Sequence, residues 1–235
     1  ITTVIGSSSS GKTLLSYILS GIIDDYTGNI ISTYKNREIG YIFQRPDEAF
    51  IFETVKEELA FGIRKYNYRV DEIDKRMEEA LKMVGLPKFY LDRNPFTLSS
   101  GEKEALALAT ILILNPKVII IDDPSISLDN YRCDHLIKLL KKLCNRYKKT
   151  IIIFSSNTQF LVRVTDNYVL LKNGKIVLSG NRRNLSDNIG KFKNANVCIP
   201  RITEFISNAN KKYNANLEYT FDIKELMKDI YRNVK

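Results

Sequence analysis

The sequence predicts an α/β fold with a mostly parallel sheet. Short apolar runs alternate with longer stretches whose apolar residues recur at helical spacing, as expected when helices connect parallel strands. A serine- and glycine-rich loop follows the first apolar run and opens a helical pattern. The expected strands are Thr2–Ile5, Glu38–Phe43, Lys117–Ile121, Thr150–Phe154 and Tyr168–Leu171.

The segments between and after these strands carry helical patterns. An apolar stripe along residues 73–84, ended by Gly85 and Pro87, predicts a helix within an insertion at about residues 64–115. The Asn- and Lys-rich stretch 181–196 is interpreted as a linker. In the tail, Asp222 is expected to cap a last helix, with Glu225 three residues on and an apolar stripe of Ile223, Leu226, Met227 and Ile230.

Composition limits the classes of protein. The 235 residues are 44% hydrophobic, enough for a sizeable core, and no apolar run approaches the roughly 20 residues of a membrane-spanning helix. Three cysteines lack metal-ligand spacing, so we expect free thiols in a reducing compartment. The only histidine, His135, argues against a histidine-rich metal site and is expected at the surface. The net charge of +9 fits nucleic acid, an anionic membrane surface or simply a lysine-rich exterior. Because the basic residues are scattered, this signal is weak, and nucleic acid is not favoured as a partner.

A phosphate-binding loop is predicted between the first strand and the first helix. In such a loop, backbone N–H groups and the helix N-terminus surround phosphate oxygens. Lys12 then reaches the β- and γ-phosphates, and the Thr13 hydroxyl coordinates Mg²⁺. The expected nucleotide-binding residues are Gly6, Ser7, Ser8, Ser9, Ser10, Gly11, Lys12, Thr13 and Leu14. Since Ile1 is not a methionine and strands normally precede such a loop, we expect a further N-terminal segment.

A second element is an apolar strand that ends in a carboxylate at Asp122. A strand followed by Asp-Asp-Pro is common and by itself uninformative. It lies about 110 residues after the phosphate loop, however, where a carboxylate organises Mg²⁺.

These motifs and three others resemble those of ABC ATPases, in the same order. Leu98-Ser99-Ser100-Gly101-Glu102 resembles the signature, Asp122-Asp123-Pro124-Ser125 the Walker B region, and Ser127-Leu128-Asp129 the D-loop. Gln44 matches the Q-loop glutamine, which in the family contacts Mg²⁺ and senses the transmembrane partner. The resemblance covers nearly the whole chain. It implies a P-loop NTPase fold of the ABC type that binds ATP or ADP and Mg²⁺, and a signature, Ser99, Ser100, Gly101 and Glu102, that completes the partner's ATP site.

Two stretches are similar to energy-coupling-factor and cobalt-type transporter ATPases: residues 40–62 and the Pro-x-hydrophobic-Thr-Glu stretch within 199–205. This resemblance implies an ATP-binding importer subunit for a vitamin or metal ion, peripheral on the cytoplasmic face of the cell membrane. Its partners would be a second ATPase subunit, an integral membrane component and, indirectly, a substrate-binding membrane subunit. The implied domains are a nucleotide-binding domain at 1–182, including the helical insertion, and a linker with a helical dimer-contact domain at 183–235.

The chain departs from the family pattern at catalytic positions. Asp123 stands where a glutamate is the usual general base, and Ser156 where a histidine contacts the γ-phosphate. A displacement of about 1 Å in a catalytic group can cost on the order of a hundredfold in rate. Ser9 and Ser100 stand where glycine is usual. We therefore expect slow hydrolysis at this chain's own site within a heterodimer, with Lys12, Gln44, Asp123 and Ser156 as catalytic residues and Thr13, Gln44 and Asp122 at the metal.

Two alternatives remain open. A soluble ABC protein acting on nucleic acid would explain the basic charge, but the sequence shows no coiled-coil insertion, zinc motif or second phosphate loop. A non-catalytic ATP sensor would share the binding residues and need no transporter.

Overall fold

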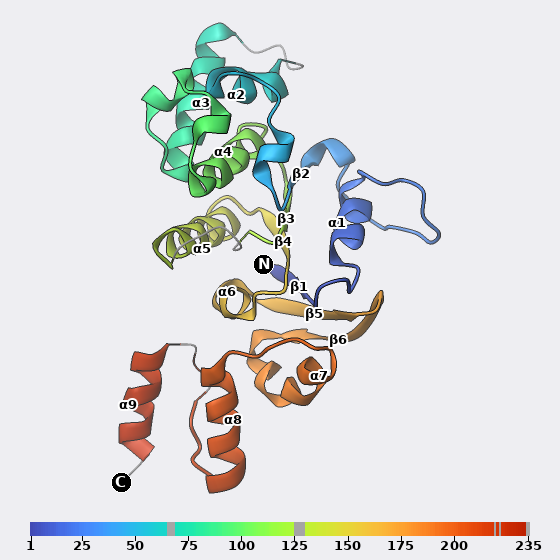
Figure 1. The fold of residues 1–235 in the computed structure, drawn as a ribbon, viewed down its shortest axis with the longest axis vertical. Coiled ribbons are helices and arrows are strands. Elements are labelled where there is room, and N and C mark those ends of the chain that lie inside the picture. Colours follow the sequence, from blue (N-terminus) through green and yellow to red (C-terminus); the bar gives the residue numbers. More distant parts are fainter. Residues whose placement is uncertain (65–68, 125–129, 219, 221, 234–235) are drawn as a thin grey trace. The chain divides into compact units, whose positions relative to one another are not determined.

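The computed structural model describes residues 1–64, 69–124, 130–218, 220 and 222–233. The chain divides into two compact units: Ile1–Lys12 with Phe154–Lys235, and Thr13–Ile153. Its strands belong to a six-stranded, mostly parallel sheet, and helices connect them (Figure 1). The predicted α/β class is confirmed.

In the unit Thr13–Ile153, β2 (Ile39–Ile42) and β3 (Val118–Asp122) pair in parallel, with Ile39 opposite Val118. Every residue of β3 is buried, as expected for an apolar strand covered on both faces. α1 (Lys12–Ser20) begins at Lys12, the last residue of the first segment of the other unit, and α5 (Asn130–Asn145) follows β3 along the chain. β4 (Thr150–Ser155) starts in this unit and ends in the other.

Three helices of this unit form a bundle. α2 (Val55–Ile63), α3 (Val70–Val84) and α4 (Ser100–Leu112) pack on one another (Figure 1), and α2 lies before the expected insertion of about residues 64–115, which contains α3 and α4. The apolar stripe on α3 is confirmed, because Met77, Ala80, Leu81 and Val84 are buried. Gly85 ends α3 in the left-handed conformation, with φ of 81°. Short 3₁₀ turns complete this unit: η1 (Asn36–Glu38), η2 (Pro46–Ala49), η3 (Lys88–Asp92) and η4 (Pro95–Thr97).

In the other unit, β1 (Thr2–Ile5) runs parallel to β5 (Asn167–Lys172), and β5 runs antiparallel to β6 (Lys175–Asn181). α6 (Thr158–Val164) lies between β4 and β5 in the chain. The sequence reading missed β6. Asn173 and Gly174, with φ of 49° and 72°, form the two-residue turn before it, and Asn-Gly is a strong hairpin signal.

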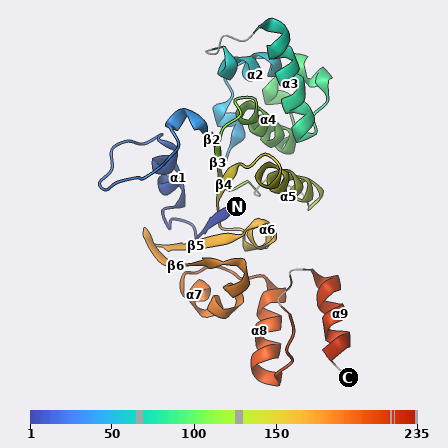
Figure 2. The same ribbon diagram turned by 180° about the vertical axis from the view of Figure 1, so that it is seen from behind.

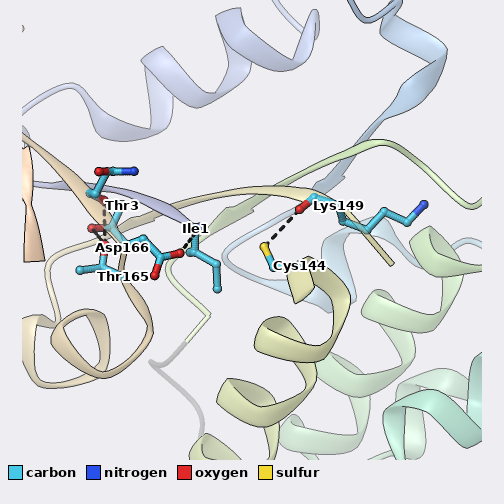
Figure 3. Close-up of polar contacts among 7 residues, drawn as sticks. Ile1, Thr3, Cys144, Lys149, Thr165 and Asp166 are labelled. Carbon is cyan, nitrogen blue, oxygen red and sulfur yellow. Dashed lines mark hydrogen bonds and ion pairs between the residues drawn. The ribbon is translucent and has the colours of Figure 1, made fainter. Parts of the chain in front are cut away.

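Each unit has polar contacts that anchor its strands (Figure 3). The hydroxyls of Thr3 on β1 and Thr165 lie 2.7 Å apart, and Thr165 also donates to the Asn167 carbonyl at 2.8 Å. In the unit Thr13–Ile153, the Cys144 thiol donates to the Lys149 carbonyl at 3.1 Å. All three cysteines are free, as predicted.

The interpretation of residues 181–196 as a linker was wrong. This stretch folds as η5 (Arg182–Asn184), η6 (Ser186–Asn188) and α7 (Ile189–Asn194), which lies beside β6 (Figure 2). Leu185, Ile189 and Phe192 are buried, and the Phe192 ring lies 5.4 Å from that of Tyr168. These three residues have helical spacing, which the surrounding Asn and Lys residues obscure.

The tail forms a helical hairpin of α8 (Arg201–Tyr213) and α9 (Ile223–Asn233), whose core contains Ile206, Leu217 and Leu226 (Figure 2). Asp222 accepts a hydrogen bond from the Lys224 N–H at 2.7 Å, so the predicted cap is confirmed. Glu225 accepts from the Thr220 hydroxyl at 2.6 Å. Across the described ranges, none of the helices combines the length and apolar character that crossing a membrane requires.

Candidate functional site

The predicted phosphate loop joins β1 to α1. Gly6 is buried, and a Cβ there would lie 2.4 Å from the Ser10 Oγ and 2.7 Å from the Leu171 carbonyl oxygen, so only glycine fits. Ser9 and Gly11 are left-handed, with φ of 61° and 98°. The Ser10 carbonyl accepts a hydrogen bond from the Gly174 N–H at 2.9 Å, which ties the loop to the β5–β6 turn.

Lys12 closes this loop on itself. Its ammonium group donates to the carbonyl oxygens of Gly6 at 3.0 Å and Ser7 at 2.8 Å. Among the described residues, the Ser10 Oγ is buried without a hydrogen-bond partner, whereas Ser8 and Ser9 are exposed. A lysine ammonium, an unpaired hydroxyl and the N-terminus of a nine-residue helix fit a phosphate group. Leu14, the last predicted nucleotide-binding residue, is 55% exposed on α1.

Thr13 and Asp122 meet within the unit Thr13–Ile153. The Thr13 hydroxyl donates to the Asp122 Oδ2 at 2.8 Å. Asp122 ends β3 and is only 2% exposed, so its carboxylate is fixed in direction by the buried strand. Hydroxyl and carboxylate oxygens fit Mg²⁺, which prefers oxygen ligands and is often shared between protein and phosphate groups.

Two side chains that the sequence reading did not identify join this pair. Ser16 donates to the Thr13 carbonyl at 2.7 Å and lies 2.9 Å from the Tyr41 hydroxyl. Tyr41 in turn lies 3.5 Å from the Asp122 Oδ2. Burial, with the Asp122 charge acting in the same direction, raises the pKa of Tyr41 well above its usual range, so the phenol stays protonated. The motifs predicted from the sequence do not include these two positions in the site, and only the fold brings them together.

The other predicted catalytic positions differ in burial. Gln44 is exposed just beyond the end of β2. Asp123 is 8% exposed and adopts a left-handed backbone, with φ of 46°. Ser156 is exposed after β4 and makes no hydrogen bond within the described part of the chain. Its neighbour Asn157 caps α6 by accepting from the Phe160 N–H at 3.2 Å. His135 is exposed, as predicted.

The signature stretch forms the start of α4. Glu102 accepts hydrogen bonds from the Ser99 N–H at 2.8 Å, the Ser99 hydroxyl at 2.7 Å and the Tyr90 hydroxyl at 2.8 Å. The hydrogen bonds from Ser99 are the main cause that lowers the pKa of Glu102 below its usual range. The hydrogen bond from Tyr90 and the positive charge of Arg132 lower this pKa further. Ser100 is exposed in the first turn, so its side chain is accommodated there. The predicted D-loop residues Ser127, Leu128 and Asp129 lie outside the described residues.

Arg132 covers the signature glycine. A Cβ on Gly101 would lie 1.9 Å from the Arg132 Nη1, and the same nitrogen lies 3.3 Å from the Ser99 hydroxyl. Next to this contact, α3, α4 and α5 border an open pocket of about 270 Å³ that Glu104 and His135 help to line. Burial, with the charge of Asp123 in addition, raises the pKa of Glu104 from 4.5 to about 8.

A comparison with protein families decides the affiliation of the chain. The family model described as ABC transporter matches residues 1–126. The chain belongs to the ABC transporter family. The energy-coupling factor transporter ATP-binding protein EcfA of Methanocaldococcus jannaschii is 31% identical, over 99% of this chain and 87% of its own length.

Solved structures of ABC proteins agree. CbiO1 of Clostridium perfringens, described as part of the ABC transporter complex cbiONQ, is 29% identical with a TM-score of 0.73, over 87% of this chain and 86% of its own. An ATP-binding cassette solved as a post-hydrolysis dimer with ADP and Pi is 26% identical with a TM-score of 0.65, over 78% of this chain and 85% of its own. The ABC fold and the similarity to energy-coupling-factor ATPases are confirmed, and family membership implies nucleotide binding. The roles of single residues stay predictions.

Proposed function

We propose that this chain is the ATP-binding subunit of an energy-coupling-factor-type ABC importer. The observation that carries the proposal is the Thr13–Asp122 hydrogen bond of 2.8 Å at the start of α1, directly after a loop whose Lys12 ammonium faces loop carbonyls. The similarity to an energy-coupling factor transporter ATP-binding protein over 99% of the chain supports this assignment.

Each part of the site has a distinct role in this proposal. The N–H groups of residues 6–14 and the Lys12 ammonium hold the phosphates of ATP. The Thr13 hydroxyl, Gln44 and Asp122 hold Mg²⁺. When bound at these residues, Mg²⁺ would supply positive charge that offsets the negative charge of the phosphates as the γ-phosphoryl group is transferred to water.

The proposed partners of this chain are inferred from its similarity to other ABC proteins. A second ABC subunit would complete a dimer, with the signature residues 99–102 and the D-loop residues 127–129 of this chain in contact with it. The post-hydrolysis relative with ADP and Pi is dimeric. Gln44 would face an integral membrane component, since the relative CbiO1 is part of an ABC transporter complex. Such a subunit works on the cytoplasmic face of the cell membrane, and it meets the substrate-binding membrane subunit only indirectly. The cargo class that the family resemblance implies is a vitamin or metal ion.

Hydrolysis at this chain's own phosphate loop is expected to be slow. Asp123 has one methylene less than glutamate, so its carboxylate stops short of the water that must attack in line. Ser156 offers a short hydroxyl where an imidazole would reach the γ-phosphate. The signature stretch keeps a well-ordered first turn on α4. The chain would therefore act as one half of a heterodimer and complete the faster site on its partner.

Nucleotide binding and turnover by the full chain alone test this function. We expect Mg²⁺-ATP to bind with negligible turnover and without self-association, measured by calorimetry, phosphate release and mass in solution. Turnover of about 1–10 per second by an ATP-induced homodimer would contradict the heterodimer. Absence of Mg²⁺-ATP binding would contradict the function itself.

Two further assays separate the alternative functions. Co-purification of a membrane component with the tagged chain supports the importer over a free-standing ATP sensor. A salt-sensitive gel shift with DNA or RNA would instead favour a protein that acts on nucleic acid, because phosphate contacts weaken steeply as salt rises.

A further inference from the structure

A short chain of hydroxyl groups connects the first turn of α1 to β2. The Ser16 hydroxyl donates to the Thr13 carbonyl at 2.7 Å and contacts the Tyr41 hydroxyl at 2.9 Å. Ser16 is fully buried, so its only polar partners are groups of the protein. Thr13 therefore has two contacts in this group: its carbonyl oxygen accepts from Ser16, and its side-chain hydroxyl donates to Asp122.

The protons in this chain can be counted. A hydroxyl has one proton, and Ser16 gives its own to the Thr13 carbonyl. The Tyr41 phenol must therefore donate along the 2.9 Å contact to Ser16, and its second acceptor is the Asp122 Oδ2 at 3.5 Å. The single proton of the Tyr41 hydroxyl is thus shared between two acceptors. One is the Ser16 Oγ, which is hydrogen-bonded to Thr13, and the other is the Asp122 Oδ2.

The position of Tyr41 is fixed by its ring as well as its hydroxyl. The ring lies 5.5 Å from Tyr17 on α1 and 4.8 Å from Phe43, both in edge-on contacts. Tyr41 belongs to β2, and Gln44 follows that strand. A phenylalanine would keep these ring contacts, so packing alone does not require the hydroxyl. A hydroxyl withdrawn from water is unfavourable unless it is hydrogen-bonded, and here its partners are the groups around Thr13 and Asp122.

We propose that Tyr41, acting with Ser16, is a positioning residue that holds Thr13 and Asp122 in place for Mg²⁺ and links that pair to the strand leading into Gln44. This inference rests on the proposed Mg²⁺-ATP function. Tyr41 itself touches neither nucleotide nor metal in this scheme. It fixes the distance between α1 and the end of β3, and any shift of β2 is transmitted to the Mg²⁺ ligands.

The test compares Mg²⁺-dependent and Mg²⁺-independent nucleotide binding in the full chain. A fluorescent ATP analogue is titrated in EDTA and then over a series of Mg²⁺ concentrations, for the unmodified chain, Tyr41→Phe and Ser16→Ala. Tyr17→Phe is the matched control, because its ring belongs to the same aromatic cluster and its hydroxyl makes no hydrogen bond within the described residues. Binding of Mn²⁺ in the presence of ATP, followed by EPR, gives a second readout that does not depend on hydrolysis.

We expect Tyr41→Phe and Ser16→Ala to need about two- to tenfold more Mg²⁺ or Mn²⁺, the range that one hydrogen bond supplies, with unchanged affinity in EDTA. The Tyr17→Phe control should match the unmodified chain. Equal Mg²⁺ dependence in all variants, or equal weakening with and without Mg²⁺, would overturn the positioning role while the proposed function stands. If the unmodified chain itself fails to bind Mg²⁺-ATP, the proposed function fails. Should Tyr41→Phe not fold, Ser16→Ala decides alone.

Discussion

Thr13 and Asp122 are 109 positions apart in the sequence, yet the hydroxyl of one donates to the carboxylate of the other at 2.8 Å. Thr13 lies in the first turn of the helix that opens at the phosphate loop, and Asp122 ends a fully buried strand. In the proposed function, this contact would hold the two oxygen ligands of Mg²⁺ side by side before the ion binds.

Asp122→Asn tests the proposed Mg²⁺ role. The amide keeps the size of the side chain but removes the charge, so we expect ATP affinity in Mg²⁺ to fall by about ten- to a hundredfold, the range for a hydrogen bond to a charged group. Affinity in EDTA should change little. Asp24→Asn, on an exposed carboxylate, is the control. An Asp122→Asn protein with unaltered Mg²⁺-ATP affinity would remove Asp122 from the proposed metal site.

Ser9→Gly should stabilise the phosphate loop. Ser9 has φ of 61°, a conformation that glycine adopts without strain and other residues adopt at about 1 kcal/mol. In a chain of this size, that gain corresponds to a rise in Tm of about 2–4 °C, measured without nucleotide. The neighbouring Ser8→Gly is the control, because Ser8 is not left-handed and glycine there only adds freedom to the unfolded chain. A higher Tm for Ser8→Gly than for Ser9→Gly would contradict the argument.

Much of the fold follows from local pattern. β1 begins and ends at the predicted residues, and the ends of the other four predicted strands lie within one residue of the observed ones, because each strand is an apolar run bounded by polar or small residues. The stripe on α3 and the cap at Asp222 are local signals as well. β6 was missed although Asn173-Gly174 announces a hairpin, since its residues are largely exposed and show no strong alternation.

The rest depends on contacts between distant parts of the chain. Phe192 is buried against Tyr168, but its neighbours are Asn and Lys, so composition pointed to a linker. Tyr41 is one of thirteen tyrosines, and only the pairing of β2 with β3 brings its hydroxyl near Asp122. The phosphate loop was predictable because its chemistry is local, whereas the hydroxyl chain around Ser16 was not.

Gly40→Ala should destabilise the unit Thr13–Ile153. Gly40 is buried on β2, and a Cβ there would lie 2.2 Å from the Ile111 Cγ2 of α4 and 3.2 Å from Pro116. Overpacking of this kind costs about 1–3 kcal/mol in the free energy of unfolding. Gly190→Ala, in α7, meets nothing within 4 Å and should leave stability unchanged or slightly higher. Denaturant unfolding of both variants checks the prediction, and equal midpoints would refute it.

Glu104→Gln should change how stability depends on pH. The pKa of Glu104 is raised from 4.5 to about 8, so between these values the folded protein keeps a proton that the unfolded chain has lost. Stability conferred by this group is complete below pH 4.5 and declines as pH rises toward 8. The side-chain amide of glutamine in Glu104→Gln does not titrate, so this pH dependence should be absent from the variant. The charged or titratable groups around Glu104 are Asp123 after β3, Glu102 on α4, Tyr90 on η3, and Tyr131, Arg132 and His135 on α5.

Relative to the unmodified chain, Glu104→Gln should differ little at pH 5 and be more stable by about 4–5 kcal/mol at pH 9, as a rise in pKa from 4.5 to about 8 implies. Urea unfolding at a series of pH values measures the difference. Glu79→Gln, on the exposed face of α3, is the control and should show no such trend. A difference between Glu104→Gln and the unmodified chain that stays constant from pH 5 to 9 would mean that Glu104 is ionised throughout.

The last prediction concerns Asp123 and Ser156 together, the two positions proposed to slow hydrolysis. Asp123→Glu restores the missing methylene, and Ser156→His supplies an imidazole at an exposed position that has room for it. In a complex with a partner ATPase whose own phosphate-loop lysine is replaced, the double variant should hydrolyse ATP about a hundredfold faster than the unmodified chain. Asp123→Asn with Ser156→His is the matched control and should stay slow.

The stability of the protein should fall with Asp123→Glu, although its turnover of ATP in the double variant is expected to rise. Asp123 has φ of 46°, a left-handed conformation that aspartate tolerates better than glutamate, so Asp123→Glu should lower stability by about 1 kcal/mol. A gain in turnover alongside a lower Tm separates a catalytic effect from better folding. If the double variant gains no turnover while it binds Mg²⁺-ATP normally, Asp123 and Ser156 do not limit hydrolysis, and the asymmetry proposed for the dimer loses its basis.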